Sequence, residues 1–126
     1  MRCRLTLLAA LLIGLPAGQV VLAAGPVPRA FAKCYACHSA DPAERDLPGP
    51  NLHALFGRRA GALPGFEFSR ALREAGRRGL VWTEEALDRF LRDPQAVVPG
   101  TTMAPPPLRD DGERRAVIEY LKREAG

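Results

Sequence analysis

The chain has 126 residues, with 18 basic and 14 acidic side chains and a formal net charge of +4 at neutral pH. This small positive excess gives little support to nucleic-acid binding. The arginine-rich stretch 58–78 is not accompanied by an aromatic stacking pattern or a recognised nucleic-acid motif. The length suffices for one small domain and is too short for two. With 12 prolines and 12 glycines, ordered loops must make up much of that domain.

The first 24 residues have the pattern of a secretory signal peptide. Its basic start, apolar middle and small-residue end are Arg2 and Arg4, residues 5–15, and Ala23 and Ala24. The alternative is an uncleaved membrane anchor, because residues 5–24 are about long enough to cross a bilayer. We expect cleavage and export to the periplasm, which leaves residues 25–126 as the folded domain. Cleavage would remove two of the 18 basic residues and lower the net charge to +2.

Capping residues and breakers predict short helices joined by long loops. The expected helices are residues 28–38, 69–78, 83–93 and a last one that begins at residue 110. Ser69, Thr83 and Asp110 would supply the N-cap oxygens, and Glu113 follows Asp110 at the spacing of a capping box. Prolines and glycines fill the intervening loops, residues 39–64 and 95–109. We find no repeat and no strand pattern, so the predicted fold is all-α with three to four helices.

The segment Cys34-Tyr35-Ala36-Cys37-His38 carries the strongest chemical signal. C-x-x-C-H is the spacing of haem attachment. The two thiols can form thioethers with the haem vinyl groups, and the imidazole can reach the iron as an axial ligand. A small, loop-rich chain could fold around so large an apolar group. One covalently bound haem c is therefore the predicted cofactor.

Two other uses of these cysteines have weaker support. A thioredoxin-like dithiol requires a strand–helix–strand context, whereas the surroundings here are rich in Pro, Ala and Arg without strand alternation. A structural zinc site requires four ligands. Beyond this segment the chain offers only His53 and Cys3, and Cys3 lies in the predicted signal peptide.

Met103 is the only methionine after the initiating one, and it lies 65 residues after His38. A thioether in the stiff loop 95–109 suits the sixth position of a low-spin haem iron, because soft sulfur stabilises the ferrous state. An iron with His38 and Met103 as axial ligands would offer no open position to a substrate. We therefore predict an electron-transfer protein and no catalysis by the chain itself.

From Cys34 onward the chain closely resembles the class I cytochrome c family, particularly its mitochondrial-type and short soluble bacterial members. The matching segments are residues 34–38, 49–58, 64–66, 99–103 and 117–121, together with Trp82 and Pro94. The resemblance implies the small class I cytochrome c fold, with ordered loops wrapped around one haem. It also implies that Cys34 and Cys37 form the thioethers and that His38 and Met103 ligate the iron.

The same resemblance implies further contacts around the haem. The carbonyl of Pro50 would accept a hydrogen bond from the second nitrogen of His38 and so fix the tautomer of the imidazole. Arg58 and Trp82 would neutralise or hydrogen-bond a buried propionate. Thr101 would also belong to the haem-binding residues.

Some positions depart from the family pattern. Phe68, Leu72 and Phe90 stand where mitochondrial-type members usually have polar residues in the haem pocket, which predicts a drier pocket. Val27 stands where the first helix usually has a glycine. The close crossing of the first and last helices is therefore not assured.

These observations lead to the hypothesis of a monomeric, periplasmic one-electron carrier. Its partners would be membrane complexes, dehydrogenases, and terminal oxidases or reductases, with no nucleic acid and with membrane contact only if the signal segment stays uncleaved. Two alternatives remain open. The chain could be a haem subunit dedicated to one redox enzyme, or a ligand-binding or peroxidase-like haem protein if Met103 is labile.

Overall fold

The computed structural model describes residues 26–103 and 107–124, so the predicted signal segment 1–24 lies outside the described residues. The helical elements are η1 (Arg29–Lys33), α1 (Arg70–Arg77), α2 (Glu84–Arg92), α3 (Pro94–Val97) and α4 (Asp111–Arg123). Within the described ranges, β pairing is limited to one isolated bridge between Arg59 and Val81, and the all-α prediction is confirmed. No helix in this part of the chain is long and apolar enough to span a membrane.

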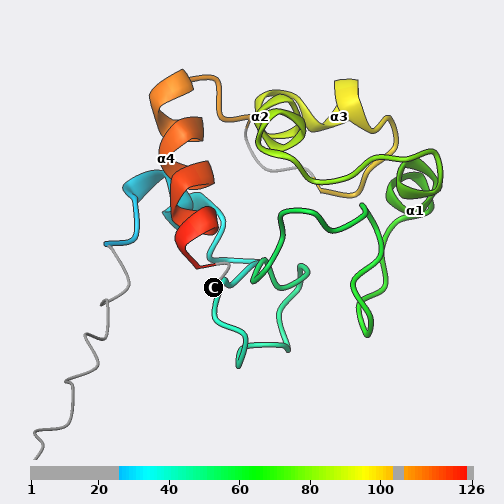
Figure 1. Ribbon diagram of the computed structural model, residues 1–126, viewed down its shortest axis with the longest axis horizontal. Coiled ribbons are helices and arrows are strands. Elements are labelled where there is room, and N and C mark those ends of the chain that lie inside the picture. The colour runs from blue at the N-terminus through cyan, green and yellow to red at the C-terminus, as the bar shows by residue number, and fades with distance from the viewer. Residues whose placement is uncertain (1–25, 104–106, 125–126) are drawn as a thin grey trace, which may run out of the picture.

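The elements surround a central space and leave a long loop region on one side. α4 stands beside η1, α2 and α3 follow along the same end of the molecule, and α1 lies on the far side (Figure 1). The loops between η1 and α1 run below the helices in this view. Lys122 of α4 pairs with Glu84 of α2 at 3.0 Å, which ties the last helix to the middle one.

The first helix is shorter than the predicted segment 28–38. η1 is a five-residue 3-10 helix, and turns follow it, in which the Cys34 carbonyl accepts hydrogen bonds from the amides of Cys37 (3.0 Å) and His38 (2.8 Å). Its N-cap, Pro28, has no side chain that could accept from the free amides of the first turn. A short segment without a cap forms only a 3-10 turn, the usual form of such pieces. The motif therefore sits on a turn at the end of η1.

The predicted N-caps are confirmed. The bonds run from the amides of Leu72, Ala86 and Glu113 to the side-chain oxygens of Ser69 (3.2 Å), Thr83 (3.1 Å) and Asp110 (2.8 Å). The Glu113 carboxylate pairs with Lys33 of η1 at 2.8 Å. Only the Asp110 half of the expected capping box is therefore seen, and the Glu113 carboxylate connects the last helix to the first.

Helix α3 corrects the prediction that the chain forms a loop from residue 95 onward. The predicted helix 83–93 corresponds to α2, which ends at Arg92 with Asp93 as its C-cap. The Asp93 carboxylate also accepts from the amide of Ala96 at 3.1 Å, and Pro94 occupies the first helical turn, where a missing amide hydrogen costs nothing. The same dipeptide therefore ends one helix and begins the next.

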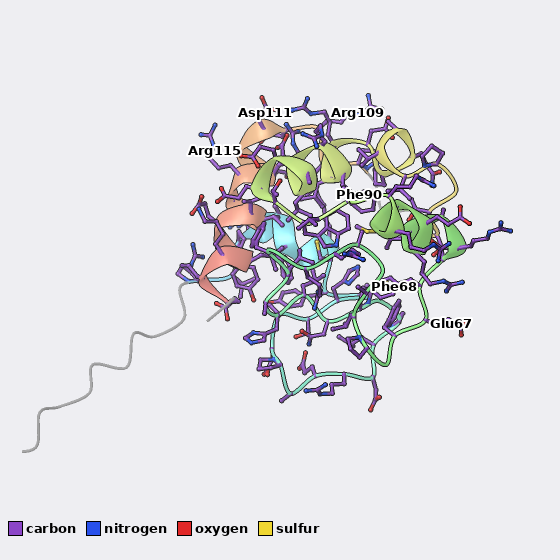
Figure 2. All side chains as sticks on the ribbon, turned by 45° about the vertical axis from the view of Figure 1, so that its right-hand side comes forward. Glu67, Phe68, Phe90, Arg109, Asp111 and Arg115 are labelled. Carbon is purple, nitrogen blue, oxygen red and sulfur yellow. The ribbon has the colours of Figure 1, made fainter. Side chains whose placement is uncertain are left out.

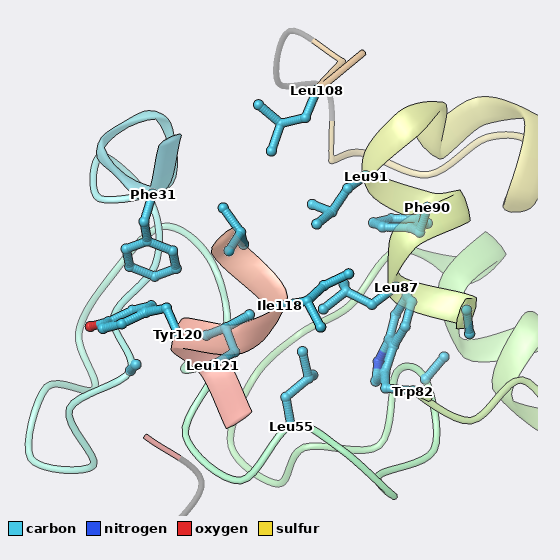
Figure 3. Close-up of a cluster of buried hydrophobic side chains, with 14 of the residues drawn as sticks. Phe31, Leu55, Trp82, Leu87, Phe90, Leu91, Leu108, Ile118, Tyr120 and Leu121 are labelled. Carbon is cyan, nitrogen blue, oxygen red and sulfur yellow. The ribbon is translucent and has the colours of Figure 1, made fainter. Parts of the chain in front are cut away.

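The first and last helices cross closely despite Val27. The rings of Phe31 and Tyr120 lie 4.6 Å apart between centroids, and Phe31 is fully buried (Figure 3). Tyr35, which lies between the two cysteines in the sequence, packs edge-on against Phe31 at 5.0 Å. Val27 is 44 % exposed and so adds no bulk to the packed interior.

Candidate functional site

A cavity of about 460 Å³ lies between the helices and the long loop region. Its lining is mainly apolar and includes Leu52, Phe68, Leu72, Trp82, Phe90 and Leu121. The three apolar replacements noted in the sequence thus all face this space. Figure 3 shows Trp82, Leu87 and Phe90 side by side within this core, and Figure 2 shows Glu67 at the outer edge with Phe68 further in. A flat apolar cofactor could be held here away from water.

The cysteines and the histidine of the motif line one wall of the cavity. Cys34 is half-buried and Cys37 is exposed. Burial raises the pKa of the Cys34 thiol, although Lys33 acts in the opposite direction. A redox-active dithiol depends on a thiolate with a lowered pKa. Cys34 therefore lacks the activation that a thioredoxin-like site would require.

His38 is held in one orientation by its loop neighbours. Its Nδ1 lies 2.8 Å from the carbonyl oxygen of Pro50, so Nδ1–H donates and Nε2 keeps the lone pair that a metal could accept. Burial lowers the pKa of His38, and the hydrogen bond with Pro50 opposes this only in part. The imidazole is therefore neutral near pH 7, which is the state that binds metals. A Cβ added at Gly49 would lie 2.5 Å from Cε1 of His38, so only glycine fits beside the ring.

Arg58 and Trp82 meet at another edge of the cavity. The Trp82 amide donates to the Arg58 carbonyl at 2.9 Å, and the Gly57 amide donates to the Trp82 carbonyl at 2.9 Å. The Arg58 guanidinium is half-buried, donates to the carbonyl of Asn51 at 3.1 Å, and has its pKa lowered by burial. The indole of Trp82 packs edge-on against Phe90 at 5.0 Å. The structure thus places a cation and an indole together at the rim of an apolar space.

Thr101 and Met103 both line the cavity, on the segment that follows α3. Thr101 is buried, and its hydroxyl accepts from the amide of Met103 at 3.3 Å. Met103 is half-buried and packs against the hydrophobic core. The thioether and the imidazole of His38 are thereby brought to one cavity from positions far apart in the chain.

Sequence reasoning missed two residues that hold this segment. Gln95 bonds to the backbone at Gly100 and Thr101, a local side-chain contact that hydrophobic periodicity does not reveal. Arg114 is 1 % exposed and donates to the carbonyls of Leu108 and Arg109. A signal for Arg114 existed, because it stands three and four residues before two apolar positions of α4 and so shares their buried face.

This donor set fits one covalently attached haem and does not fit zinc. Two thiols, a neutral imidazole, a thioether and a cation line a single apolar cavity. A covalently bound haem would need the thiols for its two thioether bonds, the imidazole and the thioether for its iron, and the cation for its propionates. In residues 26–103 and 107–124 there is no group of three His, Cys, Asp or Glu side chains that could hold a metal ion. The site is therefore that of a c-type haem protein.

Comparison with known proteins finds similar sequences and a similar fold among cytochromes c. No family model matches the chain. The cytochrome c2 of Afifella marina is 42 % identical over 94 residues, which cover 75 % of this chain and 76 % of the relative. The cytochrome c2 of Blastochloris viridis is 36 % identical over 115 residues, which cover 83 % and 88 %. The solved structure of cytochrome c2 from Rhodospirillum centenum superposes with a TM-score of 0.72 at 35 % identity and covers 77 % of this chain and 93 % of that one.

The chain belongs to the class I cytochrome c family. As a member it carries one haem c bound covalently through Cys34 and Cys37. It is an electron-transfer protein and not an enzyme, and its partners are redox proteins. The fold and the cofactor predicted from the sequence are confirmed.

Proposed function

We propose that this chain is a periplasmic one-electron carrier in which His38 and Met103 are the axial ligands of the haem iron. The observation that carries the proposal is that both side chains line the same apolar cavity as Cys34 and Cys37. The bound haem supplies reversible one-electron chemistry between its ferrous and ferric states. With His38 and Met103 both bound, the iron would have no position left for a substrate.

The chain's own residues set the conditions for that chemistry. The carbonyl of Pro50 holds the proton of His38 at Nδ1 and thereby increases the donor strength of Nε2. Arg58 would balance the charge of a propionate, with Trp82 beside it, because an unpaired charge at the rim of an apolar pocket is costly. Phe68, Leu72 and other apolar side chains of the lining would exclude water from a haem bound in the cavity.

Electrons would enter and leave at the edge of the cavity that Cys37 and the Met103 segment line. Cys37 and Thr102 both line the cavity and are exposed, so this edge is within reach of a partner surface. Membrane complexes, dehydrogenases, and terminal oxidases or reductases are the expected partners. Export rests on the basic, apolar and small-residue pattern of residues 1–24.

The absorption spectrum of protein purified from the periplasmic fraction tests this proposal. We expect haem-loaded protein in that fraction, with a low-spin ferric spectrum and the weak far-red band of a methionine ligand. A deletion of residues 1–24 should abolish haem loading, since attachment would then lack the exported chain. A five-coordinate, high-spin spectrum would contradict the carrier and favour the ligand-binding alternative.

We predict that electron transfer to an acidic partner depends only weakly on salt. Of the exposed residues at the cavity, Cys37, Pro48 and Thr102 are uncharged, and the ammonium of Lys33 is paired with Glu113 at 2.8 Å. Arg59 is then the one exposed cation of the described lining that makes no ion pair. Electrostatic steering scales with local charge and falls with ionic strength. Second-order rates measured by stopped flow should fall less than about tenfold between low and moderate salt. A fall of about a hundredfold would contradict this and would point to the arginines on and beside α1 as the docking surface.

A further inference from the structure

The residues before Met103 form a turn that is held from α3. Pro99 and Gly100 are its central residues, the amide of Thr101 donates to the carbonyl of Val98 at 3.0 Å, and Gly100 has φ +84°. These features define a type II turn, in which glycine is required at the third position. The amide of Gly100 and the carbonyl of Thr101 take no part in the bond that closes this turn. Both are bonded by a single side chain.

That side chain is the carboxamide of Gln95. Its Nε2 donates to the Thr101 carbonyl at 2.8 Å, and its Oε1 accepts from the Gly100 amide at 3.0 Å. We propose that Gln95 is a positioning residue that holds the Met103 segment in the geometry needed for iron ligation. The proposal rests on the proposed role of Met103 as an axial ligand.

The carboxamide makes both bonds because its tip carries a donor and an acceptor side by side. A lysine at the same position could donate to Thr101 but could not accept from Gly100, and a glutamate could accept but not donate. Asparagine has the same groups on a shorter side chain. The residue that carries the carboxamide is itself fixed, because Asp93 caps α3 and Pro94 opens it. The turn is thus anchored to a helix and not only closed upon itself.

The anchored turn is connected directly to the candidate ligand. The backbone of Thr101 is bonded to Gln95, and the hydroxyl of the same residue accepts from the amide of Met103 at 3.3 Å. On its other side Gly100 lies against α1, since a Cβ added there would be 3.6 Å from Cβ of Ala71. Loss of the two Gln95 hydrogen bonds would therefore allow the backbone at Gly100 and Thr101 to move, and Met103 with it.

Cyanide binding to the ferric holoprotein tests this role, because cyanide in excess binds only as fast as the methionine leaves the iron. Gln95→Met has a side chain of the same length and neither bond, and we expect it to bind cyanide about tenfold faster than the wild type. Gln95→Glu keeps the acceptor but places a carboxylate oxygen where Nε2 donated to the Thr101 carbonyl, so it too should bind cyanide faster than the wild type. Arg89→Met is the matched control, since Arg89 is an exposed α2 side chain with no hydrogen bond to the turn among the described residues, and its rate should equal that of the wild type.

Thermal unfolding of the same proteins separates positioning from general stability. We expect the unfolding midpoint of Gln95→Met to stay close to that of Arg89→Met while the cyanide rates differ. A Gln95→Met rate within about twofold of wild type, or equal acceleration in Arg89→Met, would overturn the proposal. If Gln95→Met fails to load haem, the rate of Gln95→Glu decides by the same threshold. Met103→Ala is the reference for an iron without its methionine. If the wild type binds cyanide as fast as this variant, the ligand role of Met103 is refuted. If the wild type and Gln95→Met both bind cyanide slowly, only the role of Gln95 is refuted.

Discussion

Met103→Ala is expected to leave the haem attached and to open the iron to carbon monoxide. The thioether bonds are made by Cys34 and Cys37, and they do not depend on the sixth ligand. Met103 lines the cavity from the segment that follows α3, far along the chain from Cys34 and Cys37, so its truncation removes the thioether and leaves the motif intact. We expect carbon monoxide binding to change from undetectable in the reduced wild type to stoichiometric in the reduced variant. The far-red ferric band should disappear, and the reduction potential should fall because soft sulfur no longer favours the ferrous state.

Met103→Leu is the matched control for packing. Leucine keeps most of the apolar volume beside the core and lacks the sulfur, so it should bind carbon monoxide like the alanine variant while it unfolds at a higher temperature. Agreement of the two variants in ligand binding would assign the effect to the lost sulfur and not to a cavity. The carrier proposal fails if the wild type binds carbon monoxide as readily as either variant.

The parts of the fold that the sequence predicted are those determined by contacts between near neighbours. Ser69, Thr83 and Asp110 each accept a hydrogen bond from a backbone amide three residues later, in the first turn of the helix that follows. Such a bond depends only on neighbouring residues, so the sequence can predict it. The attachment motif belongs to the same category, because Cys34, Cys37 and His38 are held close by one turn. That Met103 lines the same cavity required the whole fold, and the sequence anticipated it only through the lack of another methionine after the initiating one and through the family resemblance.

The elements that were mispredicted depend on competition between local signals. Asp93 and Pro94 end one helix and also begin α3, and a breaker does not indicate which of these roles will dominate. η1 has suitable apolar residues but no capping side chain at Pro28, so the pattern alone overstates its length. Gln95 and Arg114 were missed for a different reason. Their partners are backbone carbonyls, which have no signature in the sequence.

Arg114→Met is expected to lower the thermal unfolding midpoint of the holoprotein by roughly 10–20 °C. The guanidinium is buried, donates to the carbonyls of Leu108 (2.8 Å) and Arg109 (2.9 Å), and pairs with Asp88 at 2.7 Å and with Asp111. Methionine fills similar space but donates nothing, so two carbonyls lose their donor and the half-buried Asp88 carboxylate keeps only Arg92, at 3.1 Å. Asp111 is largely exposed and can be hydrated, and Asp111→Asn should therefore change the midpoint far less.

Arg115→Met, one residue along α4, is the matched control, because this side chain is exposed at the outer end of the helix (Figure 2). Its midpoint should stay within about 4 °C of the wild type. The Leu108 amide also donates to the carbonyl of Leu91 at 3.0 Å, so Arg114 and α2 together fix the chain where it returns from the Met103 segment. The far-red ferric band of Arg114→Met should accordingly be lost at a lower temperature than the helical signal of the same protein. If Arg114→Met unfolds within about 4 °C of the wild type, the buried arginine does not anchor the chain at Leu108 and Arg109. The bond between the Leu108 amide and the Leu91 carbonyl would then be sufficient to hold it.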